Sequence, residues 1–407
     1  HEGIMLALPL VLVGVMFDRR WPRYHLRSRD AVGAMAASSS PAAPGESARL
    51  LSGPLVVALT WINHLLGASV GREGVSLQLG AWADQSIARK IPATLTQSWL
   101  SARLAVATGF AVLFGAPLAG VVFVFESLVN SKQRERIGWR EGFALLLAAF
   151  LGDVTGRWLG VRHDAYSAWG GLQWTSVSAL RFFLYAVALA VLSAFAALFF
   201  ALFKRKMQLL VSRFLETEKL HGIVLLALVL LVIGVVFEML GGRSPYPGLG
   251  LSGMGALAVF ENPGLVHPLE QPLVLGFIKL LLTAFFVGLG LRGGEVTPLL
   301  VSGAALAVGG IHLAYPASSQ AAELSHFAFP LGATLIWSTA ARRPFTGGVL
   351  SVEIFTSGFF DRDVGLALAL LVLVTVLAHA SLLVYDQLIK KMRGVLPDGF
   401  HASLYDG

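Results

Sequence analysis

The sequence predicts an all-α polytopic membrane protein made of two inverted repeats of broken and re-entrant helices. Of its 407 residues, 56% are hydrophobic and 14% are charged, whereas soluble domains carry about 25% charged residues. Glycine and proline interrupt the apolar runs in both halves, as they do in transporters whose substrate site lies where broken helices meet. The spacing of these interruptions recurs between the halves, which indicates an internal duplication.

Charge and residue usage exclude several other classes. Lys and Arg exceed Asp and Glu by 31 to 24. The surplus lies mainly between apolar runs, as the positive-inside tendency predicts, so it does not indicate nucleic-acid binding. The absence of cysteine excludes disulfides, thiol catalysis and cysteine metal sites. The sequence also lacks His-Glu-x-x-His, Walker-type and Gly-x-Ser-x-Gly motifs. We therefore expect no enzymatic activity, no cofactor and no metal.

The first repeat is expected over residues 1–215. Its apolar segments are residues 4–16, 54–66, 75–82, 102–129, 145–160 and 182–203. Pro117 interrupts the fourth segment, and because a proline inside a helical run breaks or kinks it, we expect two half-helices to meet there. The chain is already apolar at Ile4, and we expect that sequence upstream of His1 is missing.

The second repeat is expected over residues 216–395, followed by a short polar tail over residues 396–407. Its apolar segments are residues 220–240, 272–289, 299–315, 327–337, 345–355 and 365–388. Breaks rich in Gly and Pro separate them at residues 241–255, at residues 290–298 and at Pro344. Many segments are shorter than the ~20 residues of a full membrane span. The alternative to re-entrant helices is an ordinary bundle with one or two proline-kinked helices.

The internal repeat rests on two sets of matching positions, each with identical internal spacing in the two halves. In the first set, Gly67, Gly71, Val75 and Gly80 correspond to Gly290, Gly294, Pro298 and Gly303. In the second set, Pro117, Gly120 and Glu126 correspond to Pro344, Gly347 and Glu353. The two sets have nearly the same offset along the chain, and two such matches in a chain with 17 prolines indicate duplication. The inverted orientation of the copies is inferred from the transporter pattern.

The Gly-rich breaks predict an anion site. A helix N-terminus offers free N–H groups and the positive end of the helix dipole to an anion. Glycines such as Gly71 and Gly74 let the backbone approach a ligand closely. Because each break runs directly into a helix, we expect the N–H groups of Val75, Val296 and Thr297 to face the ion.

Glu73 is predicted to gate this site, because an ionisable group within a membrane-like stretch is functional by default. Its carboxylate competes with the anion while it is ionised and vacates the site when it is protonated, which allows protons to be exchanged for anions. The alternative is a structural pair between Glu73 and Arg72, but adjacent residues on a helix do not face each other. Val296 occupies the repeat position of Glu73, so the gate has no acidic counterpart there.

For other polar residues near the breaks, the sequence is compatible with more than one role. Glu295 either caps the helix that begins nearby or carries protons and tunes the site. Glu126 and Glu353 end the two half-helices at equivalent places, which favours a structural role such as capping or pairing. Tyr385 is either a hydroxyl donor to the anion or an interfacial anchor.

The motifs that contain these residues resemble those of the CLC superfamily of chloride channels and proton-coupled anion antiporters. The run Gly67-x-x-x-Gly71-Arg72-Glu73-Gly74 resembles the superfamily signature, and Phe114-Gly-Ala-Pro-Leu-Ala-Gly120 is similar to its next motif. The run Gly293-Gly-Glu-Val-Thr-Pro298 is similar to the form in the fluoride/proton antiporter branch. The resemblance implies a homodimer with one anion path per subunit, Glu73 as the gate and Tyr385 as the central tyrosine.

The first selectivity motif of the family is absent as such. Spacing back from Pro54 places Gly33, Ala34 and Met35 at that position. Since some members of the fluoride branch carry a methionine near there, Met35 is the candidate selectivity residue. Ser127 stands where chloride/proton antiporters carry a second, proton-loading glutamate, so the chloride/proton route is incomplete.

Two arginines before Pro344 are a further departure from the family. Arg342 and Arg343 stand where the fluoride branch has small and Asn residues. They either serve the anion entrance or position the flank of the helix by snorkelling.

These observations predict an exporter in a prokaryotic plasma membrane that exchanges fluoride for protons. The predicted partners are an inorganic anion, protons, the lipid bilayer and a second copy of the chain, and nucleic acid is not among them. A chloride-selective or unselective channel of the same fold is the first alternative, because Ser127 and the altered first motif allow it. A non-transporting, degenerate paralogue is the second.

Overall fold

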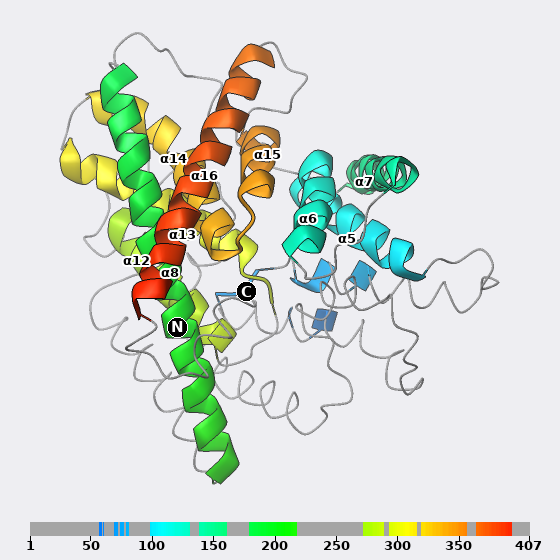
Figure 1. Cartoon of the computed structure of the whole chain (residues 1–407), viewed down its shortest axis with the longest axis horizontal. Coiled ribbons are helices and arrows are strands. Elements are labelled where there is room, and N and C mark those ends of the chain that lie inside the picture. Colours follow the sequence, from blue (N-terminus) through cyan, green and yellow to red (C-terminus); the bar gives the residue numbers. More distant parts are fainter. Residues whose placement is uncertain are drawn as a thin grey trace.

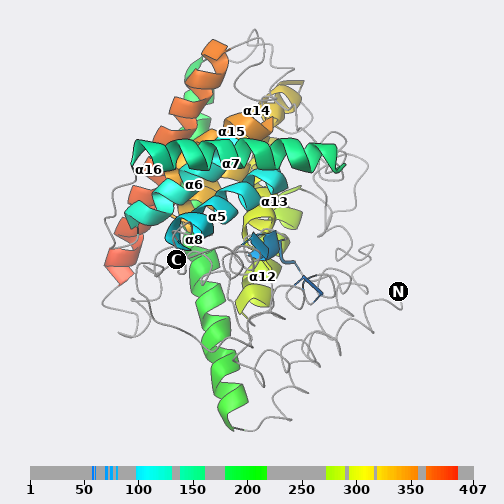
Figure 2. The same cartoon turned by 90° about the vertical axis from the view of Figure 1, so that its right-hand side faces the viewer.

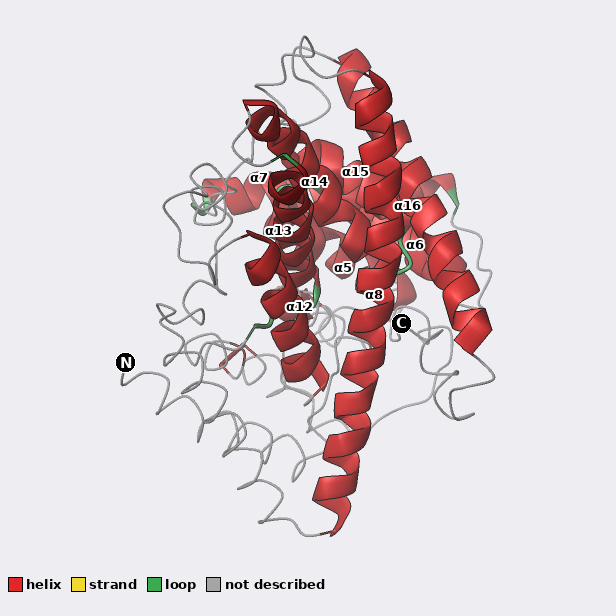
Figure 3. Ribbon diagram, turned by 90° about the vertical axis from the view of Figure 1, so that its left-hand side faces the viewer, coloured by secondary structure: helices red, strands yellow, loops and turns green. Residues whose placement is uncertain are grey.

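The computed structural model is helical over the part of the chain that it describes. The described residues are 57–58, 60, 69–71, 74–76, 79–80, 98–130, 138–160, 179–217, 272–288, 293–315, 319–355 and 364–392. Within them, the isolated antiparallel bridge between Gly71 and Gly294 is the one β-type pairing, and Figure 3 shows helices and loops without a sheet. The predicted all-α class is confirmed over these residues.

The helices pack side by side in a bundle that contains both long and short members (Figure 1). They are α5 (Ser98–Phe114), α6 (Pro117–Asn130), α7 (Trp139–Trp158), α8 (Ala179–Thr217), α12 (Pro272–Gly288), α13 (Val296–Ala314), α14 (Ser319–Ala340), α15 (Pro344–Phe355) and α16 (Val364–Met392). Among the described residues, Arg181–Leu210, Val296–Ala314 and Ala367–Met392 are long and apolar enough to cross a membrane. The remaining apolar helices, such as Pro117–Val129, are shorter, as expected for broken spans.

The two proline breaks separate half-helices as predicted. Helix α5 ends at Phe114 and α6 begins at Pro117, while α14 ends at Ala340 and α15 begins at Pro344. Proline is tolerated at the first position of a helix, because its missing N–H would have no partner within the helix there. Each proline therefore ends one half-helix and starts the next.

The two copies of the repeat pack in the same way. A Cβ atom added at Gly80 would lie 2.9 Å from the carbonyl oxygen of Ala105, and one added at Gly303 would collide with the carbonyl oxygen of Gly332. Gly80 and Gly303 are matched positions of the first set. Ala105 and Gly332 are also equivalent positions, because they are separated by the offset of the second set. The same close approach of backbones is thus built twice, which confirms the duplication.

Helix α8 is longer than the sequence predicts. Its apolar run was expected to end at Phe203, but the helix continues through Lys204, Arg205 and Lys206 to Thr217. Lys and Arg are good helix formers, so a change from apolar to basic residues ends the membrane-like stretch without ending the helix. The C-terminal part of α8 extends beyond the other helices (Figure 1), and the expected repeat boundary at residues 215 and 216 falls within it.

One apolar core joins both repeats. Large side chains that are nearly inaccessible to solvent include Phe110, Leu145, Leu189, Leu299, Phe327 and Trp337. Helix α7 lies across α5 and α6 (Figure 2). The core therefore fixes the breaks of the first repeat against those of the second.

Candidate functional site

The Gly-rich motifs of the two repeats meet at one point in the fold. The amide of Gly71 donates to the carbonyl oxygen of Gly294 at 2.6 Å, and the amide of Gly294 donates to the carbonyl oxygen of Gly71 at 2.7 Å. The two residues are matched positions of the repeat. Reciprocal contacts between equivalent residues are what a two-fold axis produces, so the copies are related by a rotation of this kind at the bridge.

Small residues and a buried hydroxyl pair hold the bridge in place. A Cβ atom at Gly74 would lie 3.2 Å from the carbonyl carbon and oxygen of Gly293, so the backbones approach more closely than a larger residue allows. The Ser69 hydroxyl lies 2.8 Å from the Thr283 hydroxyl on α12, which itself donates to the carbonyl oxygen of Lys279 at 2.7 Å. Since a hydroxyl has one proton to donate, Ser69 is the donor to Thr283.

Helical residues follow the bridge in both motifs. Gly74, Val75 and Ser76 are helical in the first motif, and α13 begins at Val296 in the second. Gly71 and Gly74 are buried, whereas Val75, Val296 and Thr297 are half-buried. The structure thus brings the helical residues 74–76 and the N-terminus of α13 close to one point, which agrees with the construction that the sequence predicts for an anion site.

Several residues assigned to the site from sequence lie outside the described part of the chain. They are Gly33, Ala34, Met35, Arg72 and Glu73. Their assignments stay predictions, and the site is described from the groups next to them.

Glu295 is the N-cap residue of α13, but its side chain makes no capping hydrogen bond. Its two carboxylate oxygens instead accept from the Lys204 ammonium at 2.9 and 3.0 Å. The Lys204 nitrogen also lies 5.2 Å from the ring centroid of Phe200. The exposed fractions of the Lys204 and Glu295 side chains are 15% and 33%, so water screens this pair only in part. Glu295 therefore acts as the counter-ion of Lys204 at the start of α13.

Lys204 was missed by the sequence reasoning, which assigned it to a basic flank after an apolar run. Ninety-one residues separate it from Glu295. No spacing or motif connects two residues so far apart, and only the continuation of α8 past its apolar run brings them together.

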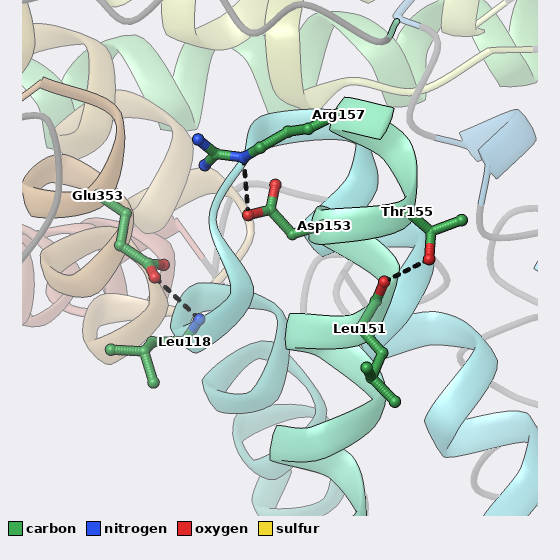
Figure 4. A network of polar contacts seen from close by, with 6 residues as sticks. All are labelled: Leu118, Leu151, Asp153, Thr155, Arg157 and Glu353. Carbon is green, nitrogen blue, oxygen red and sulfur yellow. Dashed lines mark hydrogen bonds and ion pairs between the residues drawn. The ribbon is translucent and has the colours of Figure 1, made fainter. Parts of the chain in front are cut away.

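Glu126 and Glu353 cap the two half-helices reciprocally. Glu353, near the end of α15, accepts from the amides of Leu118 and Ala119 at 2.9 and 2.7 Å. Figure 4 shows it reaching the backbone at the start of α6. Glu126 of α6 accepts from the amides of Phe345 and Thr346 at the start of α15, each at 2.8 Å. It also accepts from the Thr346 hydroxyl.

Because of these caps, carboxylates of the protein occupy the N-termini of α6 and α15. A carboxylate satisfies the amides that have no partner within the helix and complements the positive end of the dipole. Neither N-terminus is therefore available to a transported anion in this conformation. The N-cap glutamate of α13 is instead paired with a lysine. This contrast favours the α13 end, next to the bridge, as the anion site.

Tyr385 lies in the interior of the bundle on α16, with 2% of its surface exposed. It packs with Ala194, Ala197 and Leu198 of α8 in a small apolar cluster. Arg342, at the end of α14, places its guanidinium carbon 6.0 Å from the centroid of the Tyr385 ring. Burial of this kind favours a role in the interior over that of an interfacial anchor.

Arg343 has a different environment from its neighbour. It is 8% exposed, its Nη1 donates to the carbonyl oxygen of Phe123 at 3.2 Å, and its guanidinium carbon lies 4.3 Å from the Phe123 ring centroid. The Ser127 hydroxyl donates to the same carbonyl oxygen. Arg343 is thus a buried link between the two repeats and does not lie at an entrance. The Ser127 hydroxyl therefore has its hydrogen-bond acceptor within its own helix.

A separate ion pair lies on α7. Arg157 Nε donates to Asp153 Oδ2 at 3.0 Å, one turn apart on the helix (Figure 4). The Arg157 side chain is 62% exposed. Thr155, between them, donates its hydroxyl to the carbonyl oxygen of Leu151 at 2.7 Å. The Asp153 side chain is 8% exposed, so this pair joins an exposed guanidinium to a buried carboxylate.

Comparisons with known proteins agree on one family. A family profile described as voltage gated chloride channel matches residues 12–380. A chloride/fluoride channel protein of Pseudomonas syringae pv. tomato (strain ATCC BAA-871 / DC3000) is 30% identical over 321 residues. That alignment covers 74% of this chain and 62% of the relative. The chain therefore spans less than two thirds of the length of that relative.

Solved structures show the same fold at low sequence identity. A crystal structure of a CLC-type fluoride/proton antiporter is 21% identical, with a TM-score of 0.68 over 94% of this chain and 91% of that one. A slow cyanobacterial Cl-/H+ antiporter is 18% identical, with a TM-score of 0.69 over 100% of this chain and 86% of that one. A eukaryotic CLC transporter gives a TM-score of 0.64 at 17% identity, over 99% of this chain and 65% of that one. The likeness supports the predicted architecture of two inverted repeats.

Proposed function

This chain belongs to the voltage-gated chloride channel family, and on that premise we propose that it exports fluoride in exchange for protons. Members of the family are integral membrane proteins that act as channels or transporters, which agrees with the expectation of no enzymatic activity. We place the protein in a prokaryotic plasma membrane, with residues 1–215 and 216–395 as its two membrane repeats.

One observation carries the proposal: the reciprocal bridge between Gly71 and Gly294. It joins the superfamily signature of the first repeat to the Gly-Glu-Val-Thr-Pro run of the second. Glu73 is two residues from the bridge along the chain, and the N–H groups of Val296 and Thr297 follow it on the other side. A gating carboxylate and a helix N-terminus that attracts anions are thereby close in the chain to the same contact.

Each assigned residue has a role in the proposed exchange. Glu73 blocks the path as a carboxylate and opens it when it takes a proton. The backbone N–H groups of Val75, Val296 and Thr297 bind the anion, and the Tyr385 hydroxyl donates a hydrogen bond to it. The remaining candidates complete the path and its selectivity, namely Gly33, Ala34, Met35, Gly71, Arg72 and Gly74.

A proton route of the chloride-exchanging type has little support in this chain. Glu126 is fully engaged as a cap, and Ser127 donates to the carbonyl oxygen of Phe123. Glu295 is held by Lys204. Glu73 is thus left as the one strong candidate for proton exchange among the four glutamates assigned from sequence.

We propose that the protein acts as a homodimer within the lipid bilayer. One face of α7 carries large exposed apolar side chains at helical spacing, namely Trp139, Phe143, Leu147, Leu151, Val154 and Trp158. Exposed apolar patches of this extent mark contacts with lipid or with another subunit. Two-fold contact through the same face is the commonest arrangement of such pairs.

A channel or antiporter for chloride is the second candidate. The chloride/proton antiporter and the fluoride/proton antiporter match the fold almost equally, with TM-scores of 0.69 and 0.68. The Gly-Glu-Val-Thr-Pro run favours fluoride by resemblance. A non-transporting paralogue of the family is the third candidate.

Ion flux from liposomes tests the proposal. Purified protein is reconstituted into liposomes loaded with either fluoride or chloride, and anion efflux and proton uptake are recorded together. We expect faster efflux of fluoride, accompanied by proton uptake, and loss of proton uptake in the Glu73→Ala variant. Equal rates for both anions, or fluoride efflux without proton uptake, would contradict antiport. No flux from folded protein would favour the non-transporting paralogue.

A further inference from the structure

Arg342 occupies a position at a helix end that glycine normally takes. Its φ angle is 56°, and it is the one non-glycine residue with positive φ in the described part of the chain. Its amide donates to the carbonyl oxygen of Thr339 at 3.2 Å, and the amide of Arg343 donates to that of Ser338 at 2.7 Å. This is the Schellman pattern, whose left-handed residue is usually glycine because a Cβ atom is disfavoured there.

The first repeat shows what the turn itself requires. Gly115 corresponds to Arg342 at the offset of the second repeat set, and its φ angle is 63°. Both residues stand two positions before the proline that starts the next half-helix. The same turn is therefore made by glycine in one repeat and by arginine in the other. Because a Cβ atom is disfavoured in this conformation, an arginine at the turn directs attention to the contacts of its side chain.

That side chain makes a two-point ion pair with α16. Arg342 Nη1 lies 2.9 Å from Asp386 Oδ1, and Nη2 donates to Asp386 Oδ2 at 3.1 Å. The guanidinium carbon lies 6.0 Å from the ring centroid of the adjacent Tyr385. One turn earlier, the hydroxyl of Thr339 donates to that of Ser381 at 2.8 Å. The end of α14 is thus fastened to the segment of α16 that carries the tyrosine.

The pair has two physical effects on Tyr385. The ion pair combines one hydrogen bond, from Nη2 to Oδ2, with a second close contact between Nη1 and Oδ1. A planar guanidinium held at two points restrains orientation as well as distance, so the pair limits the rotation and shift of α16 at this residue. It also neutralises Asp386, whose carboxylate next to Tyr385 would otherwise repel an anion. Lysine would retain the charge but not the fixed two-point geometry.

We propose that Arg342 is a positioning residue that sets anion selectivity through Tyr385. This inference rests on the proposed function, in which the Tyr385 hydroxyl binds the transported anion. The arginine is kept in a backbone conformation better suited to glycine because its ion pair with Asp386 holds the hydroxyl at the distance that discriminates between a small and a large anion.

The test uses the full chain in liposomes and reads the ratio of fluoride to chloride efflux. Arg342→Gly suits the left-handed turn, so the melting temperature should change little while the ratio falls roughly tenfold, as expected for the loss of a charged hydrogen bond. Arg342→Lys should recover part of the ratio. In a Tyr385→Phe background, Arg342→Gly should cause no further fall. Arg140→Gln, which removes an exposed guanidinium on α7, should leave the ratio unchanged.

Each result supports or overturns the inference. A parental ratio in folded Arg342→Gly protein would overturn it, and so would an equal fall with and without the Tyr385 hydroxyl. Should Arg342→Gly fail to fold, a partial loss in Arg342→Lys supports the inference and a parental ratio overturns it. Absence of anion flux from the parent protein would overturn the proposed function as well, so the two failures are distinguishable.

Discussion

Gly71 and Gly294 exchange both of their backbone hydrogen bonds, at 2.6 and 2.7 Å, although they belong to opposite halves of the chain. Since they are equivalent positions of the repeat, the contact lies on the local two-fold axis that relates the halves. The same symmetry recurs at Glu126 and Glu353, which cap each other's helices. Contacts of this kind keep two helix starts at a fixed separation, which a site for a small ion requires.

The bridge predicts a sharp intolerance at Gly74. In Gly74→Ala, the new Cβ atom would lie 3.2 Å from the backbone of Gly293, so the two motifs must separate by a few tenths of an ångström. We expect fluoride efflux from liposomes to fall roughly tenfold, because misplacement on this scale is costly at a site that depends on geometry. Gly310→Ala is the matched control, since a Cβ atom there meets nothing within 4 Å. Equal effects of both substitutions would contradict the prediction.

The reciprocal caps predict a loss of stability when either glutamate is shortened. Glu126→Ala and Glu353→Ala each leave two amides at a helix start without their acceptor, which costs about 1–3 kcal/mol. Thermal unfolding of the purified protein should therefore begin at a lower temperature in both variants.

A glutamate at the start of α7, whose hydrogen bond is exposed to solvent, provides the comparison for the caps. Glu141 accepts from the amide of Gly138 at 3.3 Å in an exposed position, so Glu141→Ala should have a smaller effect. A different outcome, in which Glu126→Gln abolishes proton uptake at unchanged melting temperature, would show that this carboxylate carries protons instead.

Sequence reasoning located the features that are encoded locally. Pro117 and Pro344 could be found because a proline restricts its own helix, and the matched glycines because duplicated segments retain their spacing. Partnerships between helices were not predictable in this way. Lys204 with Glu295, and Arg342 with Asp386, are 91 and 44 residues apart, and their meeting depends on how the helices pack. The apolar run over residues 182–203 did not reveal where α8 ends, because hydropathy marks the membrane-like stretch and not the helix.

The pairing of Lys204 with Glu295 predicts a coupled response to substitution. Lys204→Gln or Glu295→Gln alone leaves one charge without its partner beside the start of α13, whereas the double variant removes both. We expect each single variant to lower fluoride efflux and the double variant to restore it in part. The double-mutant cycle should give an interaction energy between Lys204 and Glu295 of about 1 kcal/mol, since the pair is partly exposed.

Proton uptake distinguishes the two roles that the sequence left open for Glu295. As a counter-ion, Glu295 is dispensable once Lys204 is also neutral, so proton uptake should persist in the double variant. Loss of proton uptake in that variant, with fluoride efflux retained, would identify Glu295 as a proton carrier and remove the assignment of counter-ion.

The exposed face of α7 predicts where the subunits join. Leu147 and Leu151 lie one turn apart on that face, with exposed fractions of 49% and 57%. Replacing both by tryptophan adds bulk that a close-packed interface cannot accommodate without strain, so the molecular mass measured by light scattering in detergent should shift from dimer towards monomer. Val191 and Phe195 present a comparable face on α8, and the same replacement there should leave the mass unchanged, because the fluid detergent around the apolar surface adjusts to added volume. A dimer that survives the α7 substitutions and dissociates with the α8 substitutions would move the interface to α8.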